Sequence, residues 1–162
     1  MKKVLALFMV LLPLAACTGN QEQEQMKDTK ATPLEQYVDS MKAAYPNYAG
    51  NVAVVKIICE DFEKHITNIP GILEGTPFRI VGIAEVGGKV NVMVASEIEF
   101  GSLSVWCNDF DKQKAAQLDK SKMYHVTGGS LHHYEAESGF AEQWLDLGDL
   151  YINNLELSSI DN

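Results

Sequence analysis

Residues 78–95, FRIVGIAEVGGKVNVMVA, contain the pattern that decides the predicted fold. In the second half, Val90, Val92 and Val94 alternate with other residues, and this period of two is typical of a β-strand with one buried face. The first half is a second apolar run, interrupted by Gly82 and ended by the Gly-Gly pair at 87–88. Two short strands are therefore expected.

Further strand patterns follow on either side of a short predicted helix. Residues 103–108 place Leu103, Val105 and Cys107 on one face, and Asp111 stands where it can cap a helix. A fourth strand is expected over 123–129, with extension to 134 left open. In the last strand region, 145–157, the apolar residues change from odd to even positions at 148–149 and back to odd positions at 153–154. Each change requires an inserted residue in a bulge or turn.

The residues before 75 predict helices. Thr32, Pro33 and Glu35 form a capping-box pattern, followed by apolar residues at helical spacing up to Tyr45. The next segment fits a strand or a helix, and we favour a helix over 54–68. We therefore expect an α+β fold: one or two N-terminal helices within 32–74 pack on a five-stranded Greek-key barrel over 75–162, with a helix between strands three and four. That element order is typical of an OB-fold.

A family resemblance rests on four short segments of the barrel region: FRIVG at 78–82, VWC at 105–107, KAAQL at 114–118 and YHVTG at 124–128. With these segments, the chain from Gly75 to about Leu157 resembles the OB-fold lipoproteins called tRNA-anti-like. The family often has glycine before the fourth strand, where this chain has Ser121. The resemblance implies an OB domain of the cell envelope, and it transfers no catalytic residue.

The N-terminus is similar to the signal of bacterial lipoproteins. Two lysines precede an apolar run over 4–14, and Leu14-Ala15-Ala16-Cys17 resembles a lipobox. The resemblance implies that residues 1–16 are a signal peptide and that Cys17 carries lipid, which would anchor the protein to a membrane facing the periplasm or the exterior. Residues 17–31 are polar and predict a flexible tether spanning roughly 20–24 Å.

The charge balance argues against one class of partner. The net charge is −9, and removal of the signal takes two of the 13 Lys+Arg residues and none of the 22 Asp+Glu residues, leaving −11. Binding to phosphate backbones depends on Lys and Arg, so we expect no nucleic-acid partner. An envelope protein, a peptide or a glycan is the expected partner.

The outer face of strands two and three is the usual ligand face of an OB barrel. Alternation predicts that this face presents the candidate binding residues Asn91, Met93, Ser104, Trp106 and Asn108. An exposed Trp106 could stack on a sugar ring, a peptide side chain or a base. Alternatively, the N-terminal helices cover this face and Trp106 packs beneath them.

Cys59 and Cys107 both fall on predicted inward faces, and either a disulfide between them or two buried thiols fits the pattern. No cofactor or metal motif and no catalytic signature stands out. A non-catalytic binding module is therefore expected. A structural assembly partner remains an alternative.

An enzyme is the rival hypothesis. A small hydrolase or metal-dependent enzyme would use a loop of histidines and carboxylates, and would require His132 or His133 to converge with Glu135 or Asp109. The other groups that could take part are His125, Glu137, the Glu97 and Glu99 pair, and Asp111.

Overall fold

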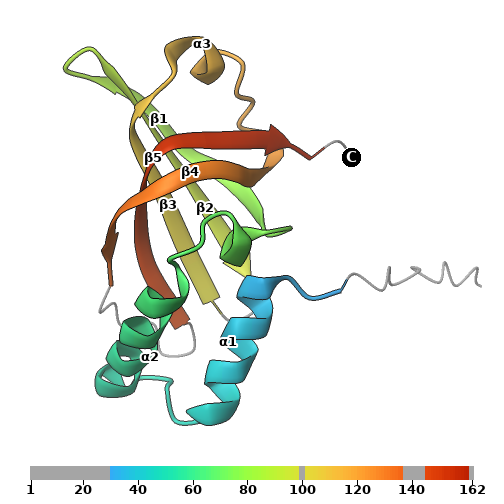
Figure 1. Ribbon diagram of the computed structural model, residues 1–162, viewed down its shortest axis with the longest axis vertical. Helices are drawn as coiled ribbons and strands as arrows, with labels where there is room; N and C mark the ends of the chain where they lie inside the picture. The colour runs from blue at the N-terminus through green and yellow to red at the C-terminus, as the bar shows by residue number, and fades with distance from the viewer. Residues whose placement is uncertain (1–29, 99–100, 137–144, 161–162) are drawn as a thin grey trace, which may run out of the picture.

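The computed structural model describes residues 30–98, 101–136 and 145–160 and has an α+β fold (Figure 1). Its elements are α1 (Pro33–Ala44), α2 (Val52–His65), the 3-10 turn η1 (Gly71–Leu73), β1 (Pro77–Val86), β2 (Lys89–Ile98), β3 (Gly101–Phe110), α3 (Lys112–Ala115), β4 (Met123–Glu135) and β5 (Leu145–Ser159). The expected order of three strands, a helix and two strands is confirmed. The predicted tether and Cys17 lie outside the described residues, apart from residues 30 and 31.

Side-chain caps fix the start of both N-terminal helices. At α1, the Thr32 side chain accepts a hydrogen bond from the Glu35 amide at 3.3 Å, and the Glu35 carboxylate accepts one from the Thr32 amide at 2.7 Å. The predicted capping box is confirmed. The ambiguous second segment is a helix, which begins at Val52 because Asn51 caps it, two residues before the expected start, and ends at His65.

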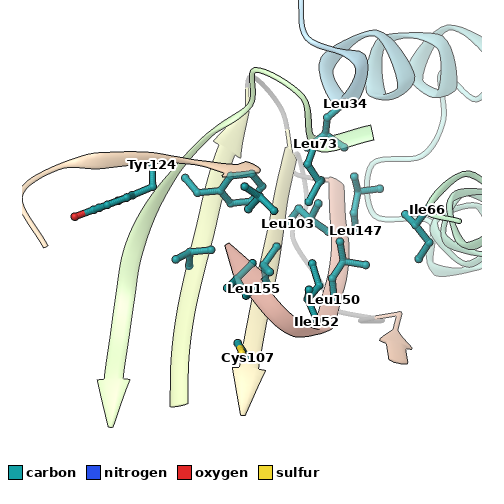
Figure 2. Packing of buried hydrophobic residues seen from close by; sticks show 14 of the residues in the cluster. Leu34, Ile66, Leu73, Leu103, Cys107, Tyr124, Leu147, Leu150, Ile152 and Leu155 are labelled. Carbon is teal, nitrogen blue, oxygen red and sulfur yellow. The ribbon is translucent and has the colours of Figure 1, made fainter. Parts of the chain in front are cut away.

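The five strands close into a barrel in the order β1-β2-β3-β5-β4. The β3–β5 pair is parallel and the other pairs are antiparallel. Inward-facing side chains such as Val92, Leu103 and Val105 are fully buried, as the alternation predicts. Figure 2 shows buried apolar residues such as Leu103 gathered inside the barrel and continuing toward the helices through Leu73 and Leu34.

The two predicted parity changes of β5 are confirmed, and both occur at residues with left-handed backbone. Gly148 has φ of 87° and Asn154 has φ of 53°. The pairing of β3 with β5 shifts next to Gly148, and the pairing of β4 with β5 shifts next to Asn154. Glycine and asparagine adopt this conformation at least cost, so each can return the next leucine or isoleucine to the core.

Helices α1 and α2 pack at one end of the barrel, and α3 lies at the other (Figure 1). The Phe62 ring of α2 meets the ring of Tyr134 at 5.8 Å, and the Tyr37 hydroxyl of α1 donates to the Ile58 carbonyl at 2.9 Å. Within the described ranges, neither helix covers the outer face of β2 and β3. The alternative in which the N-terminal helices bury Trp106 is therefore wrong.

Cys59 and Cys107 are both buried free thiols, so the disulfide alternative is also wrong. The Cys59 thiol lies 3.6 Å from the Asp146 carbonyl, and Asp146 pairs with Ser102 near the start of β3. Cys107 lies five residues further along β3, roughly 16 Å at about 3.3 Å per residue. A disulfide needs Cα atoms within about 7 Å. Figure 2 shows Cys107 far from Ile66, the residue that follows α2.

Candidate functional site

Four outward-facing side chains stand in register across four strands of the barrel. In the strand pairing, Met93 of β2 is opposite Trp106 of β3, Trp106 is opposite Tyr151 of β5, and Tyr151 is opposite His133 of β4. We call these four residues the aromatic stripe. Met93, Trp106 and Tyr151 point outward because their neighbours along each strand are buried, whereas His133 is aligned by a register shift in β4 just before it.

The rings of the aromatic stripe lie close together. The Trp106 and Tyr151 ring centroids are 6.3 Å apart with an interplanar angle of 15°, and the His133 and Tyr151 centroids are 5.7 Å apart at 33°. Rings in direct van der Waals contact face to face would be separated by about 3.5–4 Å, so the centroids here are further apart than in a tight face-to-face stack. Met93, Trp106 and Tyr151 are half-buried, and His133 is exposed. Part of the ring surface therefore faces solvent.

The nitrogen of Trp106 is on the hidden side of its ring. Trp106 Nε1 is buried and has no hydrogen-bond partner among the described residues. The solvent-accessible part of this indole is consequently carbon. It offers an apolar surface to a ligand and no hydrogen-bond donor.

Polar side chains flank the aromatic stripe on both sides. On the side toward α3 lie the amides of Asn108 and Asn153, each two residues beyond an aromatic residue on its strand, and Asn91 on β2. On the side toward α1 and α2, the strand pairing aligns one hydroxyl and two carboxylates: Ser104, Asp149 and Glu135.

The electrostatics of this face are acidic. Strands β3, β4 and β5 contain no lysine or arginine over 101–110, 123–135 and 145–159. Burial raises the pKa of the Tyr151 hydroxyl, and the charges of Asp149 and Glu135 raise it further. The Tyr151 hydroxyl also lies 3.5 Å from Glu135 Oε2. Tyr151 is therefore a neutral hydrogen-bond donor at physiological pH.

Searches against protein-family models, curated proteins and solved structures find no match to this chain.

All five binding residues predicted from the sequence lie together on the outer face of β2 and β3: Asn91, Met93, Ser104, Trp106 and Asn108. Sequence reasoning missed Tyr151 and named His133 only in the enzyme hypothesis; these two residues extend the site onto β5 and β4. The alternation of Leu150, Tyr151 and Ile152 was a usable signal, because it places Tyr151 outward. The parallel pairing that brings Tyr151 beside Trp106 has no local sequence signal.

Of the groups named in the enzyme hypothesis, His133 and Glu135 come together at Tyr151 and the other described ones lie elsewhere. His133 and Glu135 both contact Tyr151, whereas Asp109 binds Lys89 at 3.0 Å and Asp111 caps α3. The Glu97 side chain, Glu99 and Glu137 lie outside the described residues. Among the side chains that the structure does describe, no three His, Cys, Asp or Glu residues are grouped to hold a metal ion.

Among the described residues, three clefts lie away from the aromatic stripe. Two, of about 580 and 620 Å³, adjoin α3 and share Phe110, Lys114 and Glu156. A third, of about 290 Å³, separates the η1 region from β4 and is lined by Glu74 and His125 among others. The walls of the two clefts near α3 mix lysines with carboxylates and present no single charge to a ligand.

For the helices in the described part of the chain, none is long and apolar enough to span a bilayer.

Proposed function

We propose that this protein is a bacterial cell-envelope lipoprotein, anchored through Cys17, whose barrel is a non-catalytic binding module of the OB type. The closed order β1-β2-β3-β5-β4, with β3 parallel to β5 and α3 between β3 and β4, supports the OB assignment. The same features support the resemblance to the tRNA-anti-like lipoproteins. The lipobox pattern supports the location, and the polar residues after Cys17 would hold the barrel near a membrane surface.

One observation carries the binding role. Half-buried aromatic side chains lie in register across the outer face of the barrel, and no described helix covers them. Aromatic residues that keep exposed ring surface concentrate binding energy at interfaces. An envelope protein, a peptide or a glycan would bind here, and nucleic acid is disfavoured because the three strands that carry most of this face lack lysine and arginine.

The enzyme hypothesis has less support. His133 and Glu135 approach Tyr151 from the same strand, but the described residues bring no nucleophile-and-base pair and no metal-ligand group to that point. We therefore favour binding over hydrolysis.

Two experiments test the proposed function. The first replaces Cys17 by serine in the full chain, followed by membrane fractionation and palmitate labelling. Loss of label from the variant is expected, because serine has no thiol for the lipid. Equal labelling of the variant and the native chain would contradict the lipoprotein assignment.

The second experiment places a photo-crosslinking amino acid at Asn108, beside the aromatic stripe, in cells that make the full chain. The control carries it at Lys56 on α2, whose side chain is 74% exposed and lies at the opposite end of the molecule. An adduct at Asn108 and none at Lys56 is expected. Equal adducts at both positions, or none at Asn108, would contradict binding at this face.

A further inference from the structure

We propose that the aromatic stripe binds a neutral oligosaccharide chain, an inference that rests on the proposed function and names its ligand class. Each face of a pyranose ring carries C–H groups, and its rim carries hydroxyls. A site for such a chain needs aromatic carbon to cover the C–H groups and polar side chains on both sides to bind the hydroxyls. The aromatic stripe and its two flanks have this arrangement.

The ring surface meets the first requirement. The Trp106 and Tyr151 rings are nearly parallel at 15° with centroids 6.3 Å apart, and both residues are half-buried, so two neighbouring aromatic side chains keep part of their carbon surface accessible. Because Trp106 Nε1 is buried, contact with its indole is apolar. Stacking on C–H groups therefore accounts for recognition better than hydrogen bonding to the indole does.

The flanks meet the second requirement with matched hydrogen-bonding groups. Asparagine amides donate and accept, as sugar hydroxyls do, and Asn108 and Asn153 are both exposed on one side. On the other side, the Asp149 and Glu135 carboxylates accept hydrogen bonds from hydroxyls. A neutral chain of hydroxyls can pair with both flanks at once.

The charge of the face selects among glycans. Asp149 and Glu135 lie beside the stripe, and β3, β4 and β5 have no lysine or arginine to offset them. Polyanionic glycans and nucleic acids would be repelled at this surface. A basic peptide is the competing ligand, and its binding would weaken with salt, whereas binding of a neutral chain would not.

The dimensions favour a chain over a single sugar. The aromatic stripe crosses three interstrand intervals of about 4.8 Å, roughly 14 Å in all. At its β1 end, Met93 is opposite Gly82, where even an added Cβ would have no atom within 4 Å. The position opposite Met93 therefore has no side chain of its own to obstruct an oligosaccharide that extends past Met93.

Titration calorimetry on the lipidated full chain in detergent micelles tests the inference with three probes: a hexamer of N-acetylglucosamine, a hexamer of β-linked glucose, and hexalysine. We expect at least one hexasaccharide to bind, with an affinity that changes less than about twofold between low and high salt. Trp106→Ala and Tyr151→Ala should each weaken binding at least about tenfold. Val86→Ala, at a 62% exposed position on the β1–β2 turn, is the control and should leave affinity unchanged.

A second variant guards against misfolding of Trp106→Ala. Asn108 is exposed on its strand, so Asn108→Ala should keep the native melting temperature and weaken glycan binding about threefold to tenfold. Absence of binding by both hexasaccharides would overturn the inference, as would binding that Trp106→Ala leaves unchanged. Salt-sensitive binding of hexalysine alone would assign the face to a basic peptide.

The photo-crosslinking experiment separates this inference from the proposed function. An adduct at Asn108 that glycan-digesting enzymes remove supports both. An adduct that only proteases remove overturns the glycan inference and leaves a binding module in place. Absence of any adduct at Asn108 contradicts the proposed function itself.

Discussion

Trp106 and Tyr151 should stabilise one another, and a double-mutant cycle measures that coupling. The variants are Trp106→Ala, Tyr151→Ala and the double change, and the quantity is the free energy of unfolding in urea. The two rings are the central members of the aromatic stripe, 6.3 Å apart at 15°. Their coupling therefore reports directly on whether β3 and β5 pair in the register described, Trp106 opposite Tyr151.

The expected magnitudes follow from burial. Removal of a fully buried large aromatic side chain costs about 3–5 kcal/mol. Trp106 is half-buried, so about 1.5–2.5 kcal/mol is expected for Trp106→Ala. Aromatic pairs contribute about 0.5–1.5 kcal/mol beyond the area they bury. The double variant should consequently be less destabilised than the sum of the single variants by about that amount.

A matched cycle supplies the control. Val86 is 62% exposed and lies at the far end of β1 from the barrel mouth that α1 and α2 close, so Trp106→Ala and Val86→Ala should be additive within about 0.3–0.5 kcal/mol. If the effects of Trp106→Ala and Tyr151→Ala on the free energy of unfolding are additive within the same margin, the stacked arrangement of the two rings is refuted. A cost above about 3 kcal/mol for Trp106→Ala would refute the half-buried placement instead.

Three further predictions concern pH, backbone conformation and partner class. Burial raises the pKa of Tyr37 and of Tyr134, so these two tyrosines stay neutral in the folded protein at a pH near 10, where tyrosines of the unfolded chain ionise. The free energy of unfolding should therefore be unaffected by these groups below about pH 10 and fall above it by about 1.4 kcal/mol per pH unit for each tyrosine. A variant with both residues changed to phenylalanine should lose that slope in urea unfolding at alkaline pH. Gly129→Ala should cost about 2–4 kcal/mol in thermal unfolding, because φ at Gly129 is 132° and the new Cβ would meet Ile152. Gly82→Ala is the control, since the space around Gly82 is open, and should change stability by less than about 1 kcal/mol. Equal effects of the two substitutions would contradict the packing of β4 on β5. Fluorescence anisotropy with mixed single-stranded oligonucleotides should detect no appreciable binding at physiological salt, and micromolar salt-sensitive binding would overturn the exclusion of nucleic acid.

Local sequence signals predicted most of the elements because each depends on nearby residues. The Thr32 and Glu35 capping box, the alternation around Val92 and the cap at Asp111 all act within a few residues, and each is confirmed. The segment from Val52 was ambiguous by the same logic, since a run of valines and isoleucines fits either period. In the structure this segment packs against β5 at the end of the barrel, and it does so as a helix with one buried face.

The candidate site could be predicted only in part. Alternation along one strand was sufficient to place Trp106 and Met93 outward, because parity is a property of the strand alone. It could not decide whether the N-terminal helices cover that face, nor whether Cys59 reaches Cys107. Both depend on where the helices dock.

The amino-acid sequence by itself determined the order and type of the elements from 75 onward, the first N-terminal helix, the inward and outward faces of the strands, the inserted residues at Gly148 and Asn154, and the acidic balance. These follow from backbone conformation and hydrophobic burial, which act between neighbours along the chain. Only the tertiary structure decided that α1 and α2 close the end of the barrel, and that Tyr151 and His133 join Trp106. Pairing of β3 with β5 connects residues more than forty positions apart, and no local preference encodes which distant strands share hydrogen bonds.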